Sequence, residues 1–176
     1  MSYVPSHQGG FLAQPESLVF IPMTQSSTQA PVVDTAINLD AAQVQFGSWT
    51  VTISSDIITL PIGFYYLVES CTQCHYTAAS DPTTGAAYHT SQIYDETNSN
   101  YIGTKGSVWR GSGEDTYPLF SRDEKCRAFL NCTGGARTIS VKTQEFDTKI
   151  DRLNYSAGSW SYYAGSGRVI IWRLDP

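Results

Sequence analysis

The amino-acid sequence predicts an all-β fold with almost no helix. Tyr, Thr, Ser, Val and Ile are abundant and only 15% of the residues are charged, a composition that suits sheets because β-branched and aromatic side chains pack well on a pleated surface. No window shows sustained apolar spacing at 3.6 residues, whereas short apolar or alternating runs separated by turn residues recur along the chain. This pattern is typical of a β-sandwich or barrel.

The first expected strands lie at 18–22 and 31–33, on either side of a loose polar stretch. At 49–53 apolar and polar residues alternate with period two, as in a half-buried strand. The run 56–61 leads through a Pro-Ile-Gly turn into an aromatic and aliphatic strand at 64–71.

The second half of the chain continues in the same way. Residues 88–94 alternate again, and the Asp- and Asn-rich segment 95–100 indicates a turn. Further strands are expected at 101–109, 125–132, 138–143, 160–163 and 168–174.

The strand at 168–174 is the sharpest single signal. An exposed apolar strand so close to a chain end would fray or aggregate, so we expect it to be paired and buried inside a sheet. A fold completed by its last strand indicates a closed β architecture in which both ends of the chain take part.

The 176 residues are expected to form one domain, 17–176, preceded by a tail, 1–16. The tail is rich in Pro, Gly, Gln and Ser and carries isolated apolar residues. It is either disordered or a tether that inserts those apolar residues into a larger assembly.

Charge excludes several classes of partner. The net charge is −5 and no Lys or Arg precedes Lys105, so neither nucleic acid nor an anionic membrane surface is expected as a partner. No apolar stretch approaches the ~20 residues that a membrane helix needs, so membrane insertion is not expected. Without a signal peptide at the start, we expect synthesis in the cytoplasm and release by another route, such as virion assembly.

Three segments, in this order, resemble the jelly-roll superfamily of tumour necrosis factor and the complement globular heads. Residues 58–68 (ITLPIGFYYLV) look like the family's entry to its central strand, through a polar turn, a proline, a glycine and an aromatic residue. Residues 92–104 (QIYDETNSNYIGT) are similar to the next strand and turn in viral and phage members. Residues 167–174 look like the family's last strand.

The resemblance spans most of 17–176 and is closest in style to phage or viral spike and head-fibre proteins. It implies a jelly-roll sandwich of two antiparallel sheets that assembles as a homotrimer. It also implies a place on the virion surface, with the tail bound to the capsid or another virion protein and exposed loops facing a host receptor such as a glycan. The lack of a signal peptide and the short N-terminal tail favour this virion version, and the lack of a preceding collagen repeat argues against the connective role of complement-type heads.

The resemblance also assigns the two faces of the central strand. Tyr65, Leu67 and Cys71 would line the core, and the opposite parity would face the threefold axis. The expected trimer interface is Tyr66, Val68, Ile170, Trp172 and Leu174. Both faces are apolar, which a monomer with one solvated sheet face would not need. A slip of one residue would exchange the two faces.

Topology in this family suggests where a ligand would bind. Loops at 76–87, around 133–136 and around 164–167 would lie at the end away from the tail. The expected receptor-binding residues nearby are Tyr76, Asp81, His89 and Tyr163.

The cysteines are the only cluster that resembles a metal site. A zinc ion needs convergent thiolates or imidazoles, yet Cys71 and Cys74 point to opposite faces of a regular strand. The weak candidate ligands are Cys71, Cys74, His75, Cys126 and Cys132. Buried free thiols are the preferred interpretation, with a disulfide and then zinc as the alternatives. No cofactor is expected.

These observations together predict a trimeric virion surface protein used in host-cell attachment. One alternative is a structural capsid or cement protein that stabilises the shell. Another is a non-viral carbohydrate-binding, lectin-like domain. An enzyme is not expected, because no acid–base pair, nucleophile with a base or cofactor motif stands out.

Overall fold

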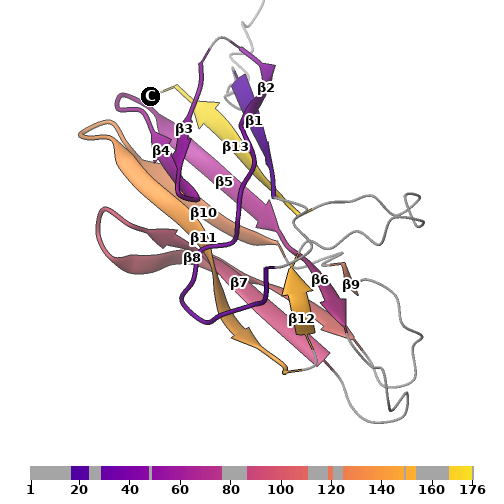
Figure 1. Cartoon of the computed structure of the whole chain (residues 1–176). Helices are drawn as coiled ribbons and strands as arrows, with labels where there is room; N and C mark the ends of the chain where they lie inside the picture. Colours follow the sequence, from indigo (N-terminus) through magenta and orange to yellow (C-terminus); the bar gives the residue numbers. More distant parts are fainter. Residues whose placement is uncertain are drawn as a thin grey trace, which may run out of the picture.

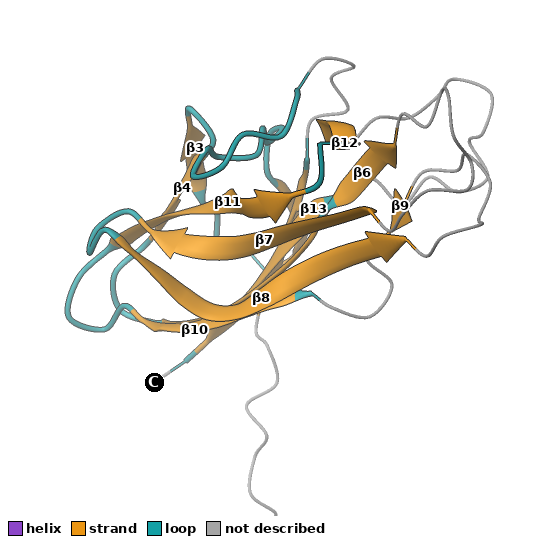
Figure 2. Cartoon of the chain, turned by 90° about the horizontal axis from the view of Figure 1, so that it is seen from below, coloured by secondary structure: helices purple, strands orange, loops and turns teal. Residues whose placement is uncertain are grey.

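The computed structural model describes residues 17–23, 29–47, 49–76, 87–110, 119–120, 125–148, 150–153 and 167–175. These residues form strands and connecting turns without any helix, which confirms the all-β prediction (Figure 2). The strands are β1 Ser17–Pro22, β2 Gln43–Phe46, β3 Thr52–Ser54, β4 Ile57–Leu60, β5 Tyr65–Cys71, β6 Gln73–Tyr76, β7 Ala87–Asp95, β8 Asn100–Arg110, β9 Leu119–Phe120, β10 Cys126–Asn131, β11 Arg137–Phe146, β12 Ile150–Leu153 and β13 Arg168–Leu174. In this described part of the chain, nothing helical could cross a membrane.

Ten of the strands form one curled antiparallel sheet in the order β2-β1-β13-β5-β10-β8-β7-β11-β4-β3 (Figure 1). The pairing is nested along the sequence, because β1 pairs with β13, β4 with β11, β5 with β10 and β7 with β8. The last strand therefore lies between β1 and β5, as predicted for 168–174. Strands β12, β6 and β9 form a separate small sheet.

The curled sheet has two halves that meet where β8 pairs with β10. Arg127 of β10 is registered with Thr104 of β8, and its backbone N–H donates to the Thr104 hydroxyl at 3.1 Å. Gly103 lies beside this junction with a φ of +71°. Buried side chains of both halves join one hydrophobic core, which includes Val19 and Ile171 from one half and Ile93 from the other.

The core corrects the predicted face of β5 by one residue. Tyr66 and Val68 are fully buried, whereas Tyr65 and Leu67 are only half-buried on the outer side. The Tyr66 hydroxyl donates to the carbonyl of Pro61 at 3.0 Å, and its ring lies 5.4 Å from that of Trp49. Burial raises the pKa of Tyr66 to about 12. The assignment of Tyr66 and Val68 to a trimer interface is therefore wrong.

The other three predicted interface residues do lie on the outer side. In β13 the buried Val169 and Ile171 alternate with half-buried outer residues. Those outer residues are Ile170, Trp172 and Leu174. Because Trp172 is registered with Leu67 of β5, directly opposed residues place both side chains on the same face.

Strand directions define two ends of the molecule. At the tail end, β1 begins at Ser17, which pairs with Arg173 near the end of β13. Since β10 is antiparallel to β5, Asn131 pairs with Tyr65, and the turn at 132–136 lies at this same end (Figure 1). The prediction that 133–136 lies away from the tail is therefore wrong. The opposite end, which we call the far end, carries the small sheet of β6, β9 and β12.

Candidate functional site

The most distinctive surface is the outer side of β1, β13, β5 and β10, which we call the outer apolar face. One row of opposed residues crosses all four strands, and every member is apolar: Leu18, Trp172, Leu67 and Phe129. Further outward-facing apolar residues flank the row: Phe20, Tyr65, Ile170 and Leu174. A sheet face turned to water would instead carry polar residues at these positions.

Phe129 is the most exposed member of this face. Its side chain is 61% exposed, the highest value among the large hydrophobic residues described. It stacks on Tyr65 of the neighbouring strand with ring centroids 5.6 Å apart and an interplanar angle of 19°. Contiguous apolar surface of this kind marks an interaction site in soluble proteins.

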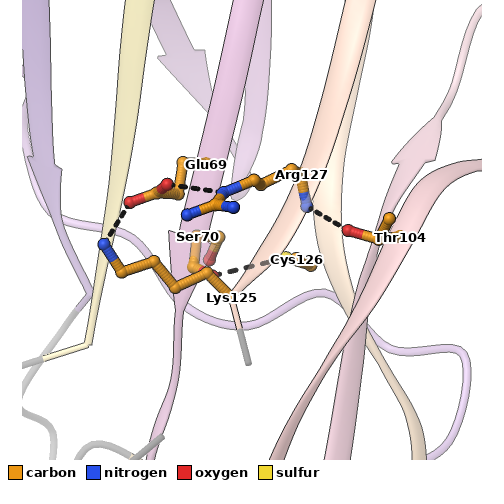
Figure 3. A network of polar contacts seen from close by, with 6 residues as sticks. All are labelled: Glu69, Ser70, Thr104, Lys125, Cys126 and Arg127. Atoms are coloured by element: carbon orange, nitrogen blue, oxygen red, sulfur yellow. Dashed lines mark hydrogen bonds and ion pairs between the residues drawn. The ribbon is translucent and has the colours of Figure 1, made fainter. Parts of the chain in front are cut away.

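The next row across the face contains the only described charges that lie between its apolar residues. Glu69 accepts hydrogen bonds from Lys125 Nζ at 2.5 Å and from Arg127 Nε at 2.8 Å (Figure 3). Burial alone would raise the pKa of Glu69, but the bonds from Lys125 and Arg127 outweigh it and hold the pKa below its usual value. The carboxylate is therefore ionised and paired, and the network of one anion and two cations keeps one net positive charge at this face.

Neither known family models nor curated proteins match this sequence.

The inner side of the same strands carries a buried polar cluster. Cys126 contacts the carbonyl of Ser70 at 3.6 Å (Figure 3), and the hydroxyls of Thr72 and Ser91 lie 3.2 Å apart. His89 lies on the same inward parity of β7 as Ser91, and its Nε2 is 3.1 Å from the hydroxyl of Thr143. These contacts link β5, β7, β10 and β11 through the interior.

The prediction that His89 binds a receptor is wrong. His89 is 1% exposed, so it cannot contact a receptor on the surface. Burial lowers the pKa of His89 to about 4, and the imidazole is therefore neutral at physiological pH. Of the other predicted receptor residues, Tyr76 ends β6 opposite Ile150 at the far end, where only its backbone is described. Asp81 and Tyr163 lie outside the described residues.

The buried histidine predicts a loss of stability in acid. Its pKa is about 4 in the folded chain and ~6.5 when unfolded, so the unfolded chain binds the extra proton between these values. The stability present near pH 7 should fall by up to about 3 kcal/mol as the pH drops to 4. Urea unfolding at pH 7, 5 and 4 measures this, and His89→Gln should show a flatter profile. Parallel profiles for the two proteins would contradict the assignment.

The cysteines do not converge as a single metal site. All four are free thiols. Cys126 and Cys132 sit at opposite ends of β10, and six strand residues span about 20 Å, so they cannot bind one ion. Cys74 is buried in the core and Cys71 is half-buried, while the side chain of His75 lies outside the described part. Among the described residues, no three metal-ligating side chains gather.

Thiol chemistry follows from this burial. Burial raises the pKa of Cys126 to about 11 and also raises the pKa of Cys74 and of Cys132, and thiolates rather than thiols react. With a thiol-reactive dye at pH 8, we expect at most one rapidly labelled cysteine, Cys71, and four after denaturation. Cys71→Ser should abolish the rapid phase. Two or more rapid equivalents in the native chain would refute this prediction.

Sequence reasoning missed the Glu69 network although the signal was present. Glu69 shares the parity of Tyr65 and Leu67, and Arg127 shares that of Phe129. An acid and a base on facing strands with the same outward parity form a cross-strand pair. Only the register between β5 and β10, which the sequence does not state, brings them together.

Proposed function

We propose that this chain is the subunit of a homotrimeric virion surface protein, a spike, fibre knob or head fibre, that attaches the particle to its host cell. The observation that carries the proposal is the outer apolar face, with its uninterrupted row from Leu18 to Phe129. A second copy is the natural cover for a surface that carries this continuous apolar row.

The strand order supports the finer fold assignment, a jelly roll like that of tumour necrosis factor. In a jelly roll a long hairpin folds over, so the first strand pairs with the last and the inner strands pair in nested order through Greek keys. The pairs β1–β13, β4–β11, β5–β10 and β7–β8 follow this rule. We therefore assign β2-β1-β13-β5-β10 and β8-β7-β11-β4-β3 to its two layers.

The corrected trimer interface consists of outward residues alone. Ile170, Trp172 and Leu174 remain from the sequence prediction, and Tyr65, Leu67 and Phe129 replace Tyr66 and Val68. Glu69 is held by Lys125 and Arg127 near the same face. Three copies packed through this face around a threefold axis would remove its apolar rows from water.

An attachment protein needs one end that binds the virion and another end that faces the host cell. Ser17, where the tail joins the domain, lies at the tail end, so we place the capsid or another virion protein there. The far end and the outer side of the second layer then face the host. On this proposal the protein is made in the host cytoplasm, resides on the virion surface, and needs neither nucleic acid nor membrane insertion.

Light scattering of the purified chain tests the assembly, with a trimer expected at micromolar concentration and a monomer contradicting it. Virions that lack the protein test the role. Loss of adsorption by otherwise stable particles supports attachment. Loss of particle stability with normal adsorption would instead support a cement protein, the second candidate, because the same apolar face could seat on the shell.

A further inference from the structure

A shallow hollow lies on the outer side of the second layer. It is lined by Asp34, Tyr94, Ser99, Asn100, Tyr101 and Lys142. These residues come from the segment beside β11, from β7, from the turn after it, and from the strands β8 and β11. Side chains from such distant parts of the chain meet only because the sheet is complete.

Two tyrosines form the apolar part of the hollow. The rings of Tyr94 and Tyr101 meet edge to face, with centroids 4.9 Å apart and an interplanar angle of 72°. The Tyr101 hydroxyl donates to Asp34 Oδ1 at 2.5 Å. Burial and this bond raise the pKa of Tyr101 to about 12, so the hydroxyl keeps its proton and its position.

Lys142 lies at another side of the hollow and is held there by two contacts. Its ammonium lies 3.5 Å from the centroid of the Tyr94 ring and 2.9 Å from the Glu96 carboxylate. Glu96 also accepts a hydrogen bond from the Ser140 hydroxyl at 2.7 Å. The aromatic rings and the charges are therefore held in place before any ligand arrives, which lowers the entropic cost of binding.

The rim, in contrast, offers uncommitted polar groups. Ser99 and Asn100 are exposed, and neither side chain has a hydrogen bond to another described residue. Ser99 and Asp34 both have positive φ, +54° and +61°, and both line the hollow. A rigid frame with a free hydroxyl and a free amide at its edge is the arrangement of a polar ligand site.

We propose that this hollow binds a neutral saccharide. An amide both donates and accepts hydrogen bonds, as the neighbouring hydroxyls of a sugar require. The Tyr94 ring is covered by Lys142, so the Tyr101 ring, which also lines the hollow, supplies the apolar surface for the C–H face of the sugar. Asp34 and Lys142 line the hollow, and Glu96 pairs with Lys142 beside it. Two carboxylates and one ammonium make the local charge negative, which repels sialic or uronic acids. The biological role of the site, as a receptor contact, rests on the proposed attachment function.

The hollow remains open in the proposed assembly. It lies on β7, β8 and β11, whereas the outer apolar face lies on β1, β13, β5 and β10. A trimer would therefore present three copies, and a shallow site with weak affinity gains avidity on a surface that displays many sugars.

Saturation-transfer NMR on the purified full chain tests the site directly. The probes are methyl glucoside and methyl N-acetylglucosaminide, with N-acetylneuraminic acid as the acidic comparison. We expect signals from a neutral probe, none from the acid, and at least a tenfold loss of signal in both Asn100→Ala and Tyr101→Phe. Tyr88→Phe, an exposed tyrosine on the same strand as Tyr94, is the matched control and should bind as the wild type does.

The outcomes separate this inference from attachment itself. No binding of either neutral probe, preference for the acid, or unchanged binding in Asn100→Ala overturns the saccharide site. If virions that carry Asn100→Ala adsorb normally, the hollow is not a receptor contact, although the protein can still attach the virion through another surface. If the chain binds the sugar but virions that lack the protein still adsorb, the saccharide site is supported and the proposed attachment function is refuted.

Discussion

Replacement of Gly103 by alanine is expected to prevent folding, or to lower the free energy of unfolding by at least about 4 kcal/mol. A Cβ at this position would lie 1.8 Å from the carbonyl oxygen of Arg127 and 2.8 Å from the Cα of Ala128. Both atoms belong to the backbone of β10 and cannot turn away. In addition, Gly103 has a φ of +71°, which an alanine adopts only with strain.

The size of this effect reflects the position of Gly103 at the junction of the two halves of the sheet. The side-chain amide of Gln92 donates to its carbonyl at 3.0 Å, in the irregular part of the β7–β8 pairing. Urea unfolding followed by circular dichroism measures the loss. Gly134→Ala is the matched control, because a Cβ there meets nothing within 4 Å, and it should change stability by less than about 0.5 kcal/mol. Similar stabilities for both variants would refute the close approach.

Replacement of Phe129 by aspartate is expected to turn the proposed trimer into a folded monomer. The side chain is 61% exposed in the single chain, so its loss should cost the isolated fold no more than about 1 kcal/mol. In the proposed trimer the same substitution would bring a carboxylate from each copy into an apolar contact, where an unpaired charge is strongly unfavourable. The effect on association should therefore far exceed the effect on folding.

Light scattering and sedimentation velocity read out the mass, and circular dichroism verifies the fold. Val33→Asp provides the control, since Val33 is 48% exposed but lies outside the four strands of the outer apolar face. It should leave the trimer intact. A Phe129→Asp chain that remains trimeric would show that another surface makes the assembly.

Long strands were predictable because their side-chain pattern is strong. The expected strands at 88–94, 101–109 and 168–174 correspond closely to β7, β8 and β13. The short strands β6 and β12 were missed, because four residues carry little pattern and depend on a partner from elsewhere in the chain. The strand expected at 31–33 is absent from the described fold. The segment after it pairs with β11 only through the isolated bridge between Ala36 and Lys142 and a few backbone hydrogen bonds around it.

The orientation of β5 could not be predicted from its sequence. Tyr65, Tyr66, Leu67 and Val68 are all apolar or aromatic, so either parity gives an apolar face. The turn before the strand determines which residues point inward, because it places the Pro61 carbonyl where it accepts a hydrogen bond from the inward-pointing Tyr66 hydroxyl. The candidate sugar site was likewise hidden, because Asp34 and Tyr101 are brought together only by the completed sheet.

The pairing of the first described strand with the last has a kinetic consequence. Ser17 pairs with Arg173, and closing a loop of roughly 150 residues costs on the order of 4 kcal/mol in chain entropy. Such long-range pairing makes folding slow, in the range of milliseconds to seconds. Because β1 and β13 are two of the four strands of the outer apolar face, a nascent chain cannot display the complete face before β13 has been synthesised. If the chain forms the proposed trimer, copies that are being synthesised on one message are thereby kept from associating too early.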